Sequence, residues 1–213
     1  MNSQEKEITY TTRNSYSTLN TLTTQTKNVW FVCHGMGYLS RYFLKYFKKL
    51  NTKENYIIAP QAPSKYYIQP KMHVGSNWLT RDATEAGMHN ILNYFDAVLD
   101  DEKIPEGVNL IVFGYSQGVS VAMRYLAKRQ LQCNQLVLHS GGIPKELNKK
   151  EFDYLSKKTQ VKLIYGTNDE YLNENRIKAE SEKALELFGD RLTILPFDGT
   201  HVVNVDYVNA LVE

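Results

Sequence analysis

The feature that most constrains this 213-residue sequence is an apolar run, residues 110–113, that leads directly into Gly-Tyr-Ser-Gln-Gly at residues 114–118. Such a run is typical of a strand buried on both faces, as in a parallel sheet covered by helices. A helical pattern follows at once, and Gly-x-Ser-x-Gly between a strand and a helix is the nucleophile-elbow pattern. The turn forces the serine into a strained conformation that exposes its hydroxyl. The N–H groups that open the new helix favour negative charge beside Ser116.

Strand and helix patterns alternate along the rest of the chain. Further buried strands are predicted at residues 29–33, 56–59, 135–139, 161–165 and 192–195, and helices at residues 39–50, 80–99, 117–130, 147–158, 173–188 and 202–212. This alternation predicts an α/β fold with a mostly parallel central sheet and helices on both faces. Residues 8–10 and 16–22 are predicted to form antiparallel strands at the N-terminal edge. Residues 60–78 are predicted as a long irregular loop, and no separate cap domain is expected.

The length, charge and composition of the chain limit its possible domain number, partners and cellular location. The chain is predicted to be one domain, residues 1–213, and its net charge of +2 without a basic stripe argues against a nucleic-acid partner. No apolar stretch approaches the ~20 residues of a membrane span, and the polar N-terminus lacks a signal-peptide pattern. Two cysteines, Cys33 and Cys133, make no disulfide framework, so a cytoplasmic location is expected. The sequence does not indicate an oligomeric state.

Four candidate reactive residues each lie just after a predicted strand: His34, Ser116, Asp169 and His201. Ligands of such sheets bind beyond the carboxyl ends of the strands. A serine nucleophile needs a base, and the base needs an acid that fixes its tautomer. After this kind of elbow the chain order is nucleophile, acid, histidine. His201 therefore fits as the base, whereas His139 would leave no acid between itself and the serine.

Asp169 is the best candidate for the acid, because it directly follows a buried strand and a Gly-Thr-Asn turn. Glu170 is adjacent and remains an alternative, whereas Asp198 is expected to shape the loop that carries the histidine. The oxyanion would be held by the backbone N–H groups of Gln117 and Met36.

His34 is expected to be structural, holding the loop at residues 34–37 by a side-chain hydrogen bond. Grouping it with His73, His89 or His139 gives no metal-ligand spacing, so no metal site is predicted.

These motifs, in this order, resemble those of the α/β-hydrolase superfamily. His-Gly-Met-Gly at 34–37, Gly-Tyr-Ser-Gln-Gly, Gly-Thr-Asn-Asp at 166–169 and Gly-Thr-His at 199–201 carry the resemblance, which covers residues 28–213. The Gly-x-Ser-Gln-Gly form is similar to the phospholipase/carboxylesterase branch, which includes acyl-protein thioesterases and small bacterial carboxylesterases. The resemblance implies a Ser116–Asp169–His201 triad, an oxyanion hole from Met36 and Gln117, and no cofactor.

One departure from that branch concerns substrate preference. Where long members have Trp-Phe-Asp, this chain has Trp-Leu-Thr-Arg-Asp at residues 78–82, so their specificity cannot be transferred. Trp78, Gly142 and Ile143 are taken as candidate substrate-binding residues. The aromatic residues Tyr66, Tyr67 and Trp78 could equally line an acyl pocket or pack against the fold.

The function predicted from these residues is hydrolysis of short- to medium-chain carboxylic esters through an acyl-enzyme on Ser116. An acyl thioesterase or lysophospholipase-type activity is the alternative within the enzyme class. A hydrolase fold that only binds a small ligand is the alternative outside it, although a binder needs no ordered nucleophile, base and acid. A dienelactone-hydrolase-like function is less favoured, because the nucleophile here is serine rather than cysteine.

Overall fold

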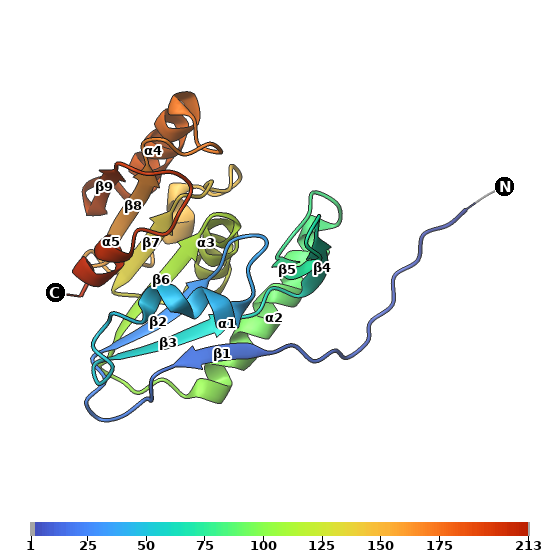
Figure 1. Cartoon of the computed structure of the whole chain (residues 1–213), viewed down its shortest axis with the longest axis horizontal. Coiled ribbons are helices and arrows are strands. Elements are labelled where there is room, and N and C mark those ends of the chain that lie inside the picture. The colour runs from blue at the N-terminus through green and yellow to red at the C-terminus, as the bar shows by residue number, and fades with distance from the viewer. Residues whose placement is uncertain (1–2, 213) are drawn as a thin grey trace.

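A seven-stranded sheet forms the centre of the computed structural model, which describes residues 3–212 (Figure 1). The strands lie in the order β1-β3-β2-β6-β7-β8-β9. Their bounds are Tyr16–Leu19 (β1), Asn28–Cys33 (β2), Asn55–Pro60 (β3), Asn109–Tyr115 (β6), Gln135–His139 (β7), Gln160–Gly166 (β8) and Leu192–Phe197 (β9). Strand β1 pairs antiparallel with β3, and the other neighbours are parallel. The structure thus confirms the predicted mostly parallel α/β sheet.

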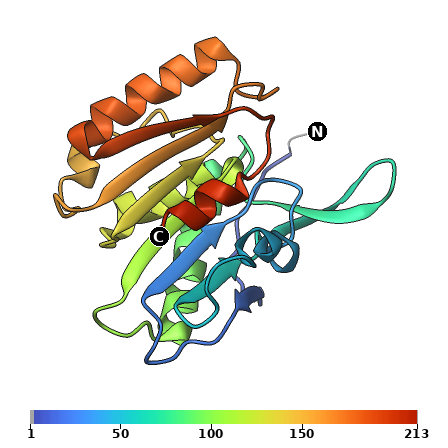
Figure 2. The same cartoon turned by 60° about the vertical axis from the view of Figure 1, so that its left-hand side comes forward.

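Helices cover both faces of this sheet (Figures 1 and 2). On one face the core includes side chains from α2 (Thr84–Glu102), α3 (Gln117–Arg129) and α4 (Glu174–Phe188). On the other it includes side chains from α1 (Ser40–Phe43), the 3-10 turn η1 (Leu44–Phe47) and α5 (Val205–Ala210). Alternate residues of β2 enter opposite cores, and all six of its residues are buried. A central strand with apolar residues on both faces follows directly from this arrangement.

Three predicted helices are shorter than the sequence pattern suggested, and one of them, residues 202–212, forms only α5. Residues 39–50 form only α1 and η1, and residues 147–158 form only the 3-10 turn η2 (Lys149–Phe152). Leu39, Phe43 and Leu147 are buried as well, but the buried apolar residues at positions 44, 47 and 50, and those at 152 and 155, lie three positions apart. Residues three apart align in a 3-10 turn, so a single tight turn suffices to bury them.

The N-terminal edge has one strand rather than the predicted pair. Strand β1 pairs with β3, but residues 8–10 form no strand. Ile8 and Tyr10 are 88% and 77% exposed, so this segment buries too little apolar surface to join the sheet. It extends away from the body of the molecule in Figure 1.

The loop predicted at residues 60–78 is wrong in its central part, which forms a β-hairpin. Strand β4 (Ser64–Ile68) pairs antiparallel with β5 (His73–Asn77), and the hairpin projects from the main sheet in both views (Figures 1 and 2). Pro70 lies in the connecting turn, where a missing N–H costs no ladder hydrogen bond. Within residues 3–212, no helix is long and apolar enough to cross a membrane.

Candidate active site

Ser116 occupies a strained turn between β6 and α3. Its backbone has φ 53° and ψ −121°, in a region that residues with side chains rarely adopt. The N–H of Ser116 donates to the carbonyl oxygen of His139 at 2.9 Å, which ties the turn to the end of β7. This conformation places the serine at the N-terminus of α3, as the elbow pattern predicted.

Two glycines permit the close packing that this turn requires. A Cβ at Gly118 would lie 1.9 Å from the carbonyl oxygen of Cys33, so no larger residue fits between α3 and β2. A Cβ at Gly35 would lie 3.1 Å from the Cβ of Ser116. The loop at residues 34–37 therefore lies directly against Ser116, where its N–H groups could donate to an oxyanion.

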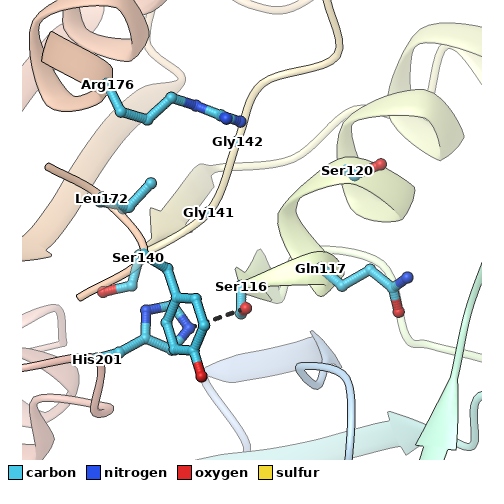
Figure 3. A pocket seen from close by; sticks show the side chains of 10 residues that line it. Ser116, Gln117, Ser120, Ser140, Gly141, Gly142, Leu172, Arg176 and His201 are labelled. Atoms are coloured by element: carbon cyan, nitrogen blue, oxygen red, sulfur yellow. Dashed lines mark hydrogen bonds between the residues drawn. The ribbon is translucent and has the colours of Figure 1, made fainter. Parts of the chain in front are cut away.

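Ser116, His201 and Asp169 form one connected hydrogen-bonded chain. The Nε2 of His201 lies 2.9 Å from the Oγ of Ser116, a contact drawn in Figure 3. Its Nδ1 lies 2.7 Å from the Oδ2 of Asp169. In this geometry Nδ1–H donates to the carboxylate, and Nε2 is free to accept the serine proton.

The Asp169 carboxylate is fixed on its other side by backbone donors. Its Oδ1 accepts the N–H groups of Tyr171 at 2.9 Å and Leu172 at 3.0 Å. Its side chain is fully buried, with 0% exposure. Both carboxylate oxygens are therefore occupied, and the one that faces His201 cannot easily rotate away.

The other two acidic candidates support the histidine loop. Glu170 Oε2 accepts the backbone N–H of His201 at 3.2 Å, and Asp198 Oδ1 accepts the amide of Asn168 at 2.9 Å. The hydroxyl of Tyr115 donates to the His201 carbonyl at 2.9 Å. This tyrosine occupies the variable position of Gly-x-Ser-x-Gly, where the sequence pattern gives no reason to expect a contact with the histidine loop.

The expected oxyanion donors are available. Among the described residues, neither Met36 N–H nor Gln117 N–H donates to a protein acceptor. His34 holds their loop as expected: its Nδ1 lies 2.8 Å from the Gly35 carbonyl, and its Nε2 accepts the N–H of Ala62 at 3.2 Å. These contacts assign the Nδ1–H tautomer to His34.

The side chain of Gln117 has a role that the sequence did not reveal. Its Oε1 accepts the N–H of Trp78 at 2.9 Å, and its Nε2 donates to Asn77 Oδ1 at 2.6 Å and to the Leu79 carbonyl at 2.8 Å. The residue after Ser116 thus fastens the base of the β4–β5 hairpin to α3.

Replacing Gln117 with alanine is expected to lower the free energy of unfolding by about 1–3 kcal/mol, because partly buried partners lose their hydrogen bonds. Urea unfolding of the variant measures this change. Gln25→Ala, at an exposed position, is the matched control and should change stability by less than about 0.5 kcal/mol. Equal stabilities for the two variants would contradict the proposed fastening.

Two buried histidines lie outside the hydrogen-bonded chain of Ser116, His201 and Asp169, which is called the relay below, and both are neutral. Burial lowers the pKa of His34 to about 4 and that of His139 to about 3, and for His139 the neighbouring His201 adds to the effect. The Nε2 of His139 accepts the N–H of Asn204 at 2.9 Å, and its Nδ1 lies 3.1 Å from Ser140 Oγ. His139 therefore steadies the segment just after His201, and its Nε2 is already occupied by the N–H of Asn204.

These two histidines predict a loss of stability in mild acid. Below the ordinary histidine pKa of about 6.5 the unfolded chain binds both protons and the native protein does not. The free energy of unfolding should therefore fall as pH decreases from about 7 to about 5, by about 2 kcal/mol per histidine. Urea unfolding at several pH values in this range measures how steeply the free energy of unfolding depends on pH. In His139→Gln this dependence should correspond to about one proton fewer taken up on unfolding. Identical slopes would refute the neutral, buried state of His139.

The three candidate substrate-binding residues lie in different places. A cavity of about 380 Å³ opens beside Ser116 and His201, and Gly142 lines it. Ile143 is buried, 5% exposed, and does not line the cavity. Trp78 is 2% exposed, and its Nε1 donates to the His34 carbonyl at 2.7 Å, which turns the indole into the core instead of the cavity.

The cavity wall comes from four segments. They are the start of α3, residues 140–142, the segment that holds residues 171 and 172 before α4 and Arg176 in its first turn, and the loop with His201. Tyr171 is 71% exposed and meets the His201 ring edge-on, with centroids 4.8 Å apart. Within residues 3–212, no cluster of three His, Cys, Asp or Glu side chains could hold a metal ion.

Comparison with known proteins agrees with this architecture. The structure matches acyl-protein thioesterase 2 from Zea mays with a TM-score of 0.69 and 16% identity, covering 93% of this chain and 96% of that one. It matches esterase PE8 with a TM-score of 0.68 and 20% identity, covering 94% and 98%. A carboxylesterase from Bacillus cereus matches with a TM-score of 0.66 and 16% identity, covering 93% and 91%. No curated protein sequence matches significantly.

The sheet order, the elbow and the flanking helices define an α/β-hydrolase. The phospholipase/carboxylesterase family model matches residues 15–211, so the chain belongs to that family. It is accordingly a carboxylic ester hydrolase.

Proposed function

We propose that this protein hydrolyses small carboxylic esters through an acyl-enzyme on Ser116. The observation that carries the proposal is the unbroken chain from Ser116 Oγ to His201 at 2.9 Å and from His201 to Asp169 at 2.7 Å. A hydroxyl with no base beside it is a poor nucleophile, whereas one that donates to a neutral imidazole is activated.

In the first half of the reaction Ser116 Oγ attacks the ester carbonyl carbon while its proton passes to His201 Nε2. Asp169 stabilises the imidazolium through Nδ1–H. The carbonyl oxygen becomes an oxyanion, and the N–H groups of Gln117 and Met36 are the proposed donors to it. When the tetrahedral intermediate collapses, His201 gives the proton to the departing alcohol.

In the second half water replaces the alcohol. His201 takes a proton from the water as it attacks the acyl carbon, and then returns this proton to Ser116 Oγ as the carboxylic acid leaves. The cavity of about 380 Å³ beside the serine suits a short or medium acyl chain. No cofactor takes part in either half.

A fluorophosphonate probe tests this proposal most directly. Labelling at Ser116, located by mass spectrometry, is expected for an activated serine and would exclude a purely ligand-binding protein. A series of p-nitrophenyl esters of increasing chain length then measures kcat/KM, which should be highest for short to medium acyl chains. An unlabelled Ser116 in a folded protein would refute the acyl-enzyme.

Thioester cleavage is the second candidate activity. One similar structure is that of an acyl-protein thioesterase, and the same relay attacks either carbonyl. Acyl-thioesters matched in chain length to the p-nitrophenyl series decide between the two by their kcat/KM values.

A cytoplasmic location remains a prediction, consistent with two buried cysteines that form no disulfide.

A further inference from the structure

The cavity beside Ser116 has one unusual wall residue, Arg176. The rest of the wall consists of three serine hydroxyls, the phenol ring of Tyr171, the amide of Gln117, the imidazole of His201, Leu172 and two glycines. Among the described residues that line the cavity, Arg176 alone carries a permanent charge. An uncharged alkyl chain offers no hydrogen-bond acceptor to this guanidinium, whereas an anionic group does.

Arg176 is held in place by a buried partner. Its Nε donates to Glu180 Oε1 at 2.5 Å, one turn further along α4. The other carboxylate oxygen of Glu180 accepts the N–H of Ile143 at 2.7 Å. The Glu180 side chain is only 11% exposed, so it forms a fixed support between α4 and the segment at residues 141–143.

The terminal nitrogens of Arg176 remain available to a ligand. The Nη2 atom would lie 2.4 Å from a Cβ at Gly142, so the guanidinium lies closely over this glycine. Among the described residues, neither Nη1 nor Nη2 donates a hydrogen bond, and the side chain is 52% exposed. Figure 3 shows Arg176 reaching from α4 to Gly142, above the Ser116–His201 pair in this view.

We propose that Arg176 binds a carboxylate on the substrate, so that the preferred substrates are small esters carrying a carboxylate. A planar guanidinium can offer paired N–H donors to a carboxylate, and such charge-assisted bonds are stronger than neutral ones. Both oxygens of Glu180 are already engaged, so this residue positions the guanidinium without closing its outer edge. The inference rests on the ester hydrolysis proposed above and names its substrate class.

Two pairs of matched esters test the proposal. For a carboxylate on the acyl side, mono-p-nitrophenyl adipate is compared with p-nitrophenyl hexanoate. For a carboxylate on the alcohol side, p-(butyryloxy)benzoate is compared with its methyl ester. In at least one pair the wild-type protein should favour the anionic member in kcat/KM, mainly through a lower KM.

Arg176→Gln should then lower kcat/KM for that anionic ester by about ten- to a hundredfold, and change the neutral member by less than about threefold. The double variant R176Q/E180Q removes both charges, so it shows the same loss without an unpaired Glu180 carboxylate. Lys178→Gln removes a cation from an exposed position of the same helix and should leave both esters unaffected.

Two results would overturn the carboxylate site. One is a wild-type protein that prefers the neutral ester in both pairs. The other is an equal loss for both members of the preferred pair in both Arg176 variants, which would indicate a purely structural role. Either result leaves ester hydrolysis itself intact, whereas failure of the acyl-enzyme would appear as an absence of turnover for every ester.

Discussion

Replacing Ser116 with alanine is expected to lower kcat/KM for p-nitrophenyl butyrate by about 10³- to 10⁶-fold. The proposed nucleophile is the Ser116 Oγ, which lies 2.9 Å from His201 Nε2. In the alanine variant a water molecule could occupy its place, but water cannot form the acyl-enzyme intermediate. The remaining rate would come from the oxyanion donors and from binding alone. Initial rates over a range of ester concentrations give the ratio.

Ser156→Ala is the matched control for this variant. Ser156 is exposed, and its Oγ accepts only the N–H of Lys158, at 3.2 Å, among the described residues. Its removal should leave kcat/KM within about twofold of wild type, since surface substitutions rarely disturb a distant site. A Ser116→Ala protein that is folded and retains more than about a tenth of the wild-type rate would end the case for a serine nucleophile.

Replacing Asp169 with asparagine is expected to lower kcat by about 10³- to 10⁴-fold, because one amide cannot make the contacts of the carboxylate. Asp169 Oδ1 accepts two backbone N–H groups, while Oδ2 accepts His201 Nδ1–H. Asparagine has a single oxygen. If that oxygen stays with the backbone donors, its NH₂ faces the imidazole and selects the Nε2–H tautomer, which cannot take the serine proton.

Glu170→Gln separates this role from that of the neighbouring acid. Glu170 contacts the backbone N–H of His201 at 3.2 Å, a bond that a glutamine oxygen can also accept. The variant should therefore lose less than about tenfold in kcat. If Glu170→Gln were as damaging as Asp169→Asn, the acid of the relay would have been assigned to the wrong residue.

The parts of the fold that could be predicted are the strands whose own residue pattern shows whether one or both faces are buried. A run such as residues 29–33 is apolar on both faces, so it must lie inside a sheet covered twice. Parallel strands also bring their carboxyl ends to one edge, which is why the sequence alone groups residues as far apart as Ser116 and His201.

What could not be predicted depends on partners distant in the sequence. Trp78 lies in the core because its indole N–H reaches the His34 carbonyl at 2.7 Å, and no local pattern encodes that bond. The β4–β5 hairpin could not be predicted because Pro60, Pro63 and Pro70 favour a loop and the tyrosines fit either context. Arg176 lies in a helix rich in charged residues, where the sequence does not distinguish it, and only the fold brings its guanidinium over Gly142.

The positions of Ser116 and His201 in the sheet have a consequence for how local unfolding would affect the proposed catalytic residues. Ser116 follows β6, which has paired strands on both sides, whereas His201 follows β9, which is paired only with β8 and has no buried residue. Local opening of a native protein begins at such poorly supported borders. Opening that begins at this edge strand would carry the imidazole away from Ser116 while β6 stays paired, so the alignment of the proposed catalytic residues depends on an edge of the sheet and not on its interior.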